Sequence, residues 1–278
     1  MRTRYTAALC QMDTQADRDK NLNTACRLAA EAAERGADFA LFPEVFNVID
    51  RGEAPPERIP DGPSVARMAE AARRHGIWIL CGSLMEADPR GGKKYNTSVL
   101  LNPQGEVAAK YAKLHLFDAV LPDGGKAFES ETVQPGHTPV IADTPLGRLG
   151  LSICYDLRFP ELYRWMALNG AQVFLIPAEF NRGTGRLHWE VLLRARAIEN
   201  GCYVIAPAQL GLKQTKDGPY ACYGSSMVVD PDGTVIARAP DQVGVTLAEI
   251  DLARVDAVRE RIPSLKNRRS DIFQLNGC

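Results

Sequence analysis

The sequence predicts an α/β protein built as a four-layer α-β-β-α sandwich of two sheets. The main observation is a repeated pattern of helix, glycine, apolar strand and proline: residues 36–46 resemble residues 170–180. Two further pairs follow in the same order, residues 76–79 with 201–204 and residues 98–105 with 226–233. Two sheets that each carry helices on one face bury their remaining faces most simply against each other. We therefore expect two similar halves related by a pseudo-two-fold repeat.

The first half begins with a helix over residues 18–35, in which apolar residues recur at helical spacing and after which Gly36 ends the helix. A strand follows at 38–42. A second helix is predicted over 64–74 with Ser64 as its N-cap, because serine oxygens accept hydrogen bonds from free backbone N–H groups. The remaining expected elements are a strand at 77–81, paired strands at 96–101 and 106–111, and a long loop at 114–137.

The second half contains an apolar strand that ends near Ile153 and a helix that opens at Pro160, since proline suits the first turn of a helix. A loop over Phe180–Arg186 follows the second strand that ends in proline. The stretch His188–Glu199 is predicted to be a helix with structural arginines. The last segment, about 252–278, has a helical part and then a basic run. We expect this tail at a subunit interface of a homodimer or a larger even oligomer.

Composition favours one soluble α/β domain over residues 1–278. The formal net charge is −1, so no global charge attracts nucleic acid, and no apolar run is long enough to cross a membrane. The chain has seven cysteines, an odd number, and no CxxC motif. This argues against a disulfide framework or a cysteine zinc site and favours the reducing cytoplasm. We expect no metal and no cofactor.

Three stretches place one ionisable residue each at or near the end of an apolar strand. Glu44 follows the strand at 38–42, Lys113 lies within Tyr111–Asp118, and Cys154 lies within Gly150–Leu162. A lone cysteine is most often a small buried hydrophobe, and it becomes a nucleophile only when neighbours activate it. Glutamate and lysine at corresponding strand ends are candidates for those neighbours.

In these three motifs, which occur in the family's order, the sequence resembles the nitrilase superfamily of carbon–nitrogen hydrolases. The resemblance runs from about Thr6 to about Asp271 and implies the same four-layer fold. It implies that Cys154 attacks an amide carbon to form a thioester, with Glu44 as the base for the thiol and later for water. It also implies that Lys113 stabilises the oxyanion and that Glu129 orients Lys113 and the substrate amide.

Substrate contacts are predicted from position. The backbone N–H of Tyr155, directly after Cys154, is a natural second oxyanion donor. Arg158 lies one helical turn past the cysteine and can bind a carboxylate bidentately; its structural alternative is an ion pair. Phe180 and Thr184 lie on the predicted loop and border the same cleft. Gly183 and Gly185 would leave room for the leaving group.

The resemblance is strongest to the amidases of deaminated glutathione, which implies release of 2-oxoglutarate and cysteinylglycine. An omega-amidase acting on 2-oxoglutaramate or 2-oxosuccinamate is the alternative within the same superfamily. Two readings lie outside it: a Cys–His hydrolase that uses His188 or His115, and a binding scaffold without catalysis. Activity in variants of Glu44 or of either histidine would separate them.

Overall fold

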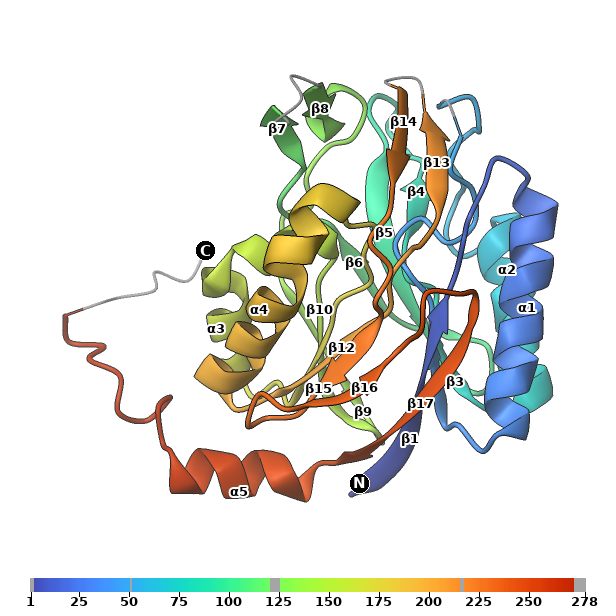
Figure 1. The fold of residues 1–278 in the computed structure, drawn as a ribbon. Helices are drawn as coiled ribbons and strands as arrows, with labels where there is room; N and C mark the ends of the chain where they lie inside the picture. The colour runs from blue at the N-terminus through green and yellow to red at the C-terminus, as the bar shows by residue number, and fades with distance from the viewer. Residues whose placement is uncertain (1–2, 51, 121–125, 216–217, 273–278) are drawn as a thin grey trace.

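Two β-sheets pack face to face and carry helices on their outer sides (Figure 1). The computed structural model describes residues 3–50, 52–120, 126–215 and 218–272. Helices α1 (Arg18–Glu34) and α2 (Pro63–His75) cover one sheet. Helices α3 (Pro160–Leu168) and α4 (Arg182–Asn200) cover the other. The predicted α-β-β-α sandwich is confirmed.

The first sheet has the strand order β17-β1-β2-β3-β5-β4, and β6 also pairs with β5. Its strands are β1 (Arg4–Gln11), β2 (Phe39–Leu41), β3 (Trp78–Leu80), β4 (Leu84–Glu86), β5 (Tyr95–Leu101), β6 (Val107–Ala112) and β17 (Gly244–Asp251). Side chains alternate across these strands. Phe39 and Leu41 face the second sheet, whereas Ala40 and Phe42 pack with the helices α1 and α2.

The second sheet has the order β16-β15-β12-β11-β10-β9. Its strands are β9 (Val140–Thr144), β10 (Gly147–Leu151), β11 (Val173–Leu175), β12 (Tyr203–Ala206), β15 (Met227–Val229) and β16 (Val235–Arg238). Leu149 and Leu151 join the core between the sheets. A Cβ on Gly150 would lie 2.7 Å from the sulfur of Met166, so this glycine lets α3 pack closely on the sheet.

The repeat seen in the sequence is also a repeat of strand pairing. In each half a strand (β1 or β10) pairs in parallel with the next (β2 or β11), which pairs in parallel with a third (β3 or β12). That third strand pairs antiparallel with β5 or β15, and an antiparallel strand, β17 or β9, lies beside the first. The two halves therefore present corresponding strand ends to each other.

Three local predictions need correction. Helix α2 begins at Pro63, so Ser64 lies inside its first turn rather than at the N-cap. The Glu57 carboxylate takes the capping role instead, accepting hydrogen bonds from the Ser64 N–H at 2.9 Å and from its hydroxyl at 2.6 Å. The helix predicted over His188–Glu199 begins earlier, at Arg182.

The third correction concerns the long loop at 114–137. It contains the short strands β7 (Asp118–Val120) and β8 (Lys126–Phe128), which pair with each other, and the 3-10 turn η1 (Glu129–Glu131). A second hairpin joins β13 (Leu212–Thr215) and β14 (Gly218–Ala221). Both hairpins project at the same end of the sandwich (Figure 1).

The predicted C-terminal helix is α5 (Ala253–Arg261). In the chain after it, Leu265 packs against the main hydrophobic core. Figure 1 shows part of this segment extending to one side of the sandwich, and the end of the predicted tail, residues 273–278, lies outside the described residues. Within the described part of the chain, none of the helices is both long and apolar enough to span a membrane.

Candidate active site

Glu44 and Cys154 each follow the end of a parallel strand, one in each half. Glu44 comes shortly after β2 ends at Leu41, and Cys154 comes shortly after β10 ends at Leu151. Because the two sheets pack face to face, these strand ends meet at one edge of the core. Burial there is nearly complete, with Glu44 4% exposed and Cys154 9% exposed. The Glu44 carboxylate opposes ionisation of the Cys154 thiol, because two negative charges repel each other where water is excluded.

The Glu44 carboxylate accepts hydrogen bonds on both oxygens. Its Oε1 accepts from Lys113 Nζ at 2.9 Å and from Asn96 Nδ2 at 3.0 Å, and its Oε2 accepts from the Glu179 N–H at 2.9 Å. The Cys154 thiol lies close enough for this carboxylate to raise the pKa of the thiol. The carboxylate is therefore oriented from several sides and lies beside the thiol.

Lys113 bridges Glu44 and Glu129. Its Nζ lies 2.9 Å from Glu44 Oε1 and 2.9 Å from Glu129 Oε2. Burial alone would lower the pKa of Lys113, but the charges of Glu129 and Glu44 outweigh burial and raise this pKa well above its usual value. Burial would likewise raise the pKa of Glu129, but Lys113 and the Phe117 N–H outweigh it, so that pKa is lowered. Lys113 is consequently a permanent positive charge in a dry site.

Burial, and then the Glu44 carboxylate, raise the pKa of the Cys154 thiol well above its usual range. The resting sulfur is therefore protonated. To act as a nucleophile it must pass its proton to a neighbour, and Glu44 is the carboxylate with the largest influence on the pKa of this thiol. If the thiol reacts, Glu44 is therefore the expected acceptor of its proton.

The turns that follow β2 and β10 each contain a residue in the left-handed backbone conformation. Cys154 has φ 47° and Val45, directly after Glu44, has φ 49°, which is strained for a β-branched residue. The Val45 N–H donates to Ser83 Oγ at 3.0 Å, and Gln209 Nε2 donates to the Glu44 carbonyl at 3.0 Å. Such strain persists only where surrounding bonds over-determine it, as they do here.

The Cys154 turn forms the 3-10 helix η2 (Cys154–Arg158). The buried Asp156 carboxylate accepts from the Ile153 N–H at 2.8 Å, from the Tyr111 hydroxyl at 2.7 Å and from the His115 N–H at 3.0 Å. From α4, Arg196 Nη2 donates to the Leu157 carbonyl at 2.8 Å, which confirms the structural role predicted for an arginine of this helix.

The residues predicted to contact substrate lie around this turn. The Arg158 guanidinium lies over the rings of Tyr155, at 5.8 Å, and Phe180, at 5.3 Å. Its Nη1 lies 3.2 Å from His188 Nδ1. Arg158 is therefore presented on an aromatic surface. Its structural alternative was an ion pair with Glu161 or Asp156, and the Asp156 oxygens already accept hydrogen bonds from other donors.

Residues 182–186 belong to α4, so the predicted loop over Phe180–Arg186 is wrong beyond Asn181. Thr184 lies in the first turn, and its hydroxyl is 3.5 Å from the Asn181 carbonyl. A Cβ on Gly185 would lie 2.5 Å from the Cβ of Tyr223. Gly185 therefore makes room for Tyr223 and not for a leaving group.

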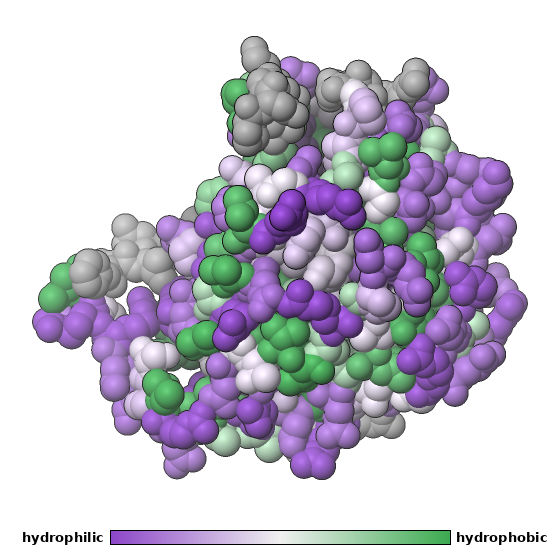
Figure 2. Space-filling view, in the orientation of Figure 1, coloured by the Kyte–Doolittle hydropathy of each residue, from purple (hydrophilic) through white to green (hydrophobic). Residues whose placement is uncertain are grey.

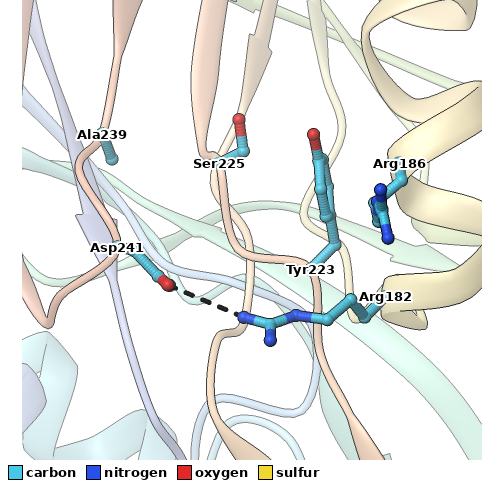
Figure 3. A pocket seen from close by; sticks show the side chains of 6 residues that line it. All are labelled: Arg182, Arg186, Tyr223, Ser225, Ala239 and Asp241. Atoms are coloured by element: carbon cyan, nitrogen blue, oxygen red, sulfur yellow. Dashed lines mark ion pairs between the residues drawn. The ribbon is translucent and has the colours of Figure 1, made fainter.

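A cavity of about 480 Å³ lies beside the start of α4 (Figure 3). Its lining residues are Arg182, Arg186, Tyr223, Ser225, Ala239 and Asp241. Arg182 and Asp241 form an ion pair across it at 3.6 Å. The residues of the Glu44, Lys113 and Cys154 cluster do not line this cavity, so it is a surface feature separate from the candidate site.

Sequence reasoning missed two residues of the cluster. Asn96, at the start of β5, donates to Glu44 and, at 3.1 Å, to Glu129 Oε1, and so ties the two carboxylates together. Glu179, directly after the Pro177-Ala178 pair, contacts Glu44 through its N–H. Its place in the repeated strand-proline pattern was the one available signal, because Glu44 follows the matching proline of the first half.

The two histidines of the Cys–His alternative have other partners. His115 Nδ1 lies 2.7 Å from Asp156 Oδ1, and its ring stacks on Phe159 with centroids 3.7 Å apart. His188 faces Arg158. The geometry therefore favours Glu44 as the base. Across the described residues, His, Cys, Asp and Glu side chains form no cluster of three or more that could bind a metal ion.

Comparison with known proteins fits this geometry. The sequence model of the carbon-nitrogen hydrolase family matches residues 6–260. A mouse protein named deaminated glutathione amidase is 42% identical, over 96% of this chain and 84% of its own. A Xenopus tropicalis protein named omega-amidase NIT2 is 38% identical over 98% of each chain.

The crystal structure of the Caenorhabditis elegans NitFhit protein superposes with a TM-score of 0.89 and 41% identity. It covers 98% of this chain, whereas this chain spans only 66% of that one. With these matches, the fold and the buried site define a hydrolase of carbon–nitrogen bonds. The chain belongs to the carbon–nitrogen hydrolase family, as the sequence motifs predicted.

Proposed function

We propose that this hydrolase is a thiol-dependent amidase with Cys154 as nucleophile and Glu44, Lys113 and Glu129 as its catalytic partners. The observation that carries the proposal is a continuous chain of contacts, from the thiol to Glu44, from Glu44 to Lys113 and from Lys113 to Glu129. Glu44 supplies the proton acceptor, Lys113 supplies a fixed positive charge and Cys154 supplies the nucleophile.

In the acylation half-reaction Glu44 takes the thiol proton as the Cys154 sulfur attacks the amide carbon. Lys113 and the Tyr155 N–H stabilise the oxyanion that forms, each donor contributing about 3–4 kcal/mol in mutational terms. The carbon–nitrogen bond breaks, Glu44 returns the proton to the leaving nitrogen, and a thioester remains. Glu44 then takes a proton from water, which attacks the thioester and releases the carboxylic acid and the thiol. Neither a metal nor an organic cofactor enters this sequence.

The substrate we propose is deaminated glutathione, hydrolysed to 2-oxoglutarate and cysteinylglycine. Arg158 lies four residues past the nucleophile and can bind a carboxylate in bidentate geometry, with the Phe180 ring beside it. We propose Thr184, in the first turn of α4, as a further substrate contact. A short acid would then place its far amide at Cys154. The name of the mouse relative supports this substrate.

The alternative substrate is an omega-amide such as 2-oxoglutaramate or 2-oxosuccinamate, supported by the name of the Xenopus relative. Deaminated glutathione and 2-oxoglutaramate share the acyl half and give the same acyl-enzyme. The choice between them therefore depends on the leaving group, cysteinylglycine or ammonia. A nitrile is a weaker candidate, because nothing in the sequence after Cys154 resembles the nitrilases themselves.

The test compares kcat/KM for deaminated glutathione and 2-oxoglutaramate in the wild type, Cys154→Ala, Arg158→Ala and a control, Arg186→Ala, which removes an exposed arginine of α4. We expect deaminated glutathione to be preferred, Cys154→Ala to be inactive, and Arg158→Ala to impair both substrates while Arg186→Ala impairs neither. A tenfold preference for 2-oxoglutaramate, about 1.4 kcal/mol in transition-state binding, would establish the omega-amidase instead. Activity in Cys154→Ala would refute the mechanism.

We also propose that the chain forms a homodimer or a larger even assembly. Exposed apolar side chains lie along α4, namely Leu187 at 71%, Val191 at 65% and Ile198 at 52% exposure. Hydrophobic patches are visible over the region of this helix (Figure 2), and part of the segment after α5 extends to one side of the sandwich (Figure 1). Apolar surface of this kind marks an interface. Light scattering that finds a monomer at micromolar concentration would contradict the proposal.

The proposed location is the cytoplasm. Six cysteines are free: Cys10, Cys26, Cys81, Cys154, Cys202 and Cys222. The seventh, Cys278, lies outside the described residues. Reduced thiols, one of them the proposed nucleophile, suit a reducing compartment. The formal charge of −1 favours a small-molecule amide, and not nucleic acid or membrane, as the partner.

A further inference from the structure

The main-chain N–H of Glu179 contacts the catalytic cluster, and the Glu179 side chain lies beside that cluster. Its N–H donates to Glu44 Oε2 at 2.9 Å, and the same N–H lies close enough to Cys154 to lower the pKa of the thiol. This backbone group follows β11, next to the strand that leads into Cys154. Any change in the Glu179 peptide therefore reaches the base and the nucleophile together.

The side chain of Glu179 points to the β13–β14 hairpin. Its Oε1 accepts a hydrogen bond from the Tyr220 hydroxyl, and Cys222 Sγ lies 4.0 Å from the same oxygen. Tyr220 is on β14, far from Glu179 in the chain. The hairpin thus fixes the carboxyl group in place, at a distance from Glu44 short enough for charge repulsion.

The groups that face Glu179 come from four parts of the fold. They are Glu44 after β2, Lys113 after β6, Lys213 on β13, and Tyr220 with Cys222 on and after β14. Lys213 is largely engaged elsewhere, because its Nζ donates to Asp13 Oδ1 at 2.7 Å and to the Thr14 carbonyl at 2.9 Å. Lys113 is shared between Glu44 and Glu129. Glu179 therefore has no cation of its own among these groups.

The consequence is a carboxyl group that ionises near neutrality. Burial, and then repulsion by Glu44, raise the pKa of Glu179 to about 7, although the Tyr220 hydrogen bond and the two lysines oppose the rise. Because repulsion is mutual, the ionised Glu179 makes Glu44 a stronger acceptor of the thiol proton.

We propose that Glu179 is a positioning residue whose negative charge, fixed beside Glu44 by Tyr220, strengthens Glu44 as the base for Cys154. This inference rests on the proposed function, in which Glu44 takes the thiol proton. Glu179 itself neither touches the substrate nor exchanges its proton with it. It acts through Glu44. Tyr220, on the β13–β14 hairpin, supports this role by holding the Glu179 carboxylate in place.

The inference predicts a feature of the pH profile. In the wild type, kcat/KM should rise with an apparent pKa near 7 as Glu179 ionises. Glu179→Gln keeps the backbone N–H and an acceptor for Tyr220 but has no charge, so this rise should disappear and kcat/KM at high pH should fall by at least about fivefold. Tyr220→Phe removes the hydrogen bond that favours the ionised form, so the rise should move to higher pH.

The experiment measures kcat/KM on one amide substrate across the neutral range for the wild type, Glu179→Gln, Tyr220→Phe and the double variant. Tyr223→Phe is the matched control, because its hydroxyl lies in the separate cavity beside α4. We expect the double variant to match Glu179→Gln and the control to match the wild type. Thermal melts verify that each variant is folded.

An unchanged rise in Glu179→Gln, or an unmoved rise in Tyr220→Phe, would overturn the inference. Failure of the proposed function would look different: Glu44→Gln or Cys154→Ala would then remain active. If those two variants are inactive while Glu179→Gln keeps the wild-type profile, the mechanism stands and only the role of Glu179 is refuted.

Discussion

The Nζ of Lys113 lies 2.9 Å from the Oε1 of Glu44, and the two side chains are 3% and 5% exposed. A buried ion pair depends on both partners, because removal of one leaves an uncompensated charge away from water. Here a third group, Glu129, shares the same ammonium. Variants of this cluster should therefore change the free energy of unfolding as well as the rate of catalysis.

Replacement of Glu44 by glutamine should block acylation. The amide keeps an oxygen for Lys113 and Asn96 but cannot accept the thiol proton of Cys154. Mass spectrometry after mixing with substrate should show little acyl adduct in Glu44→Gln. As a control, Glu57→Gln alters another buried glutamate, one that contacts Ser64 and Asn47, and should still form the adduct. Rapid stoichiometric thioester in Glu44→Gln would identify another residue as the base.

Lys113→Ala should cost both activity and stability. It leaves Glu44 and Glu129 buried without their cation, which predicts a loss of roughly 3–5 kcal/mol in the free energy of unfolding. Addition of Glu129→Gln removes one of the two charges and should restore part of that loss without restoring turnover. Urea unfolding of the single and double variants gives the coupling energy. Equal stability of Lys113→Ala and the wild type would contradict the buried pair.

Gly185→Ala should destabilise the fold by about 1–3 kcal/mol, because the new methyl group would overlap Tyr223. Gly183→Ala is the matched control on the same turn, where the nearest atom outside the turn backbone is Asn181 Oδ1 at 3.2 Å. It should lie within about 1 kcal/mol of the wild type, since alanine favours helix. Thermal unfolding of both variants measures the difference, and equal melting temperatures would refute the close packing.

The raised pKa of Glu179 predicts that the free energy of unfolding falls as pH rises. Burial, and then Glu44, raise the pKa of Glu179 from its ordinary value of 4.5 to about 7, so the folded state resists its ionisation. The wild type should therefore lose stability relative to Glu179→Gln as pH rises from below 4.5 through 7, by at most about 3 kcal/mol. Urea unfolding across that range measures the gap, and Glu34→Gln, an exposed glutamate, serves as control. A gap that is constant with pH would exclude the shifted ionisation.

Much of the fold was readable from the sequence because it depends on local periodicity. Apolar spacing placed α1, α2 and the strands around them, and the repeated strand-proline pattern led to two sheets packed as a sandwich. Glu44, Lys113 and Cys154 were named from the motifs around them, and Glu129 was named from the family resemblance. The structure brings all four together.

Other features depended on contacts between residues far apart in the chain. Ser64 looked like a helix cap, but Glu57 performs that role through an approach that no local pattern encodes. Asn96 and Tyr220 reach the cluster only because β5 and β14 pass beside it. Sequence fixes which side chains a helix or strand presents, since those periods are intrinsic to the backbone. Which of them meet across the core, and with what shift in pKa, is decided by how the two sheets pack and exclude water.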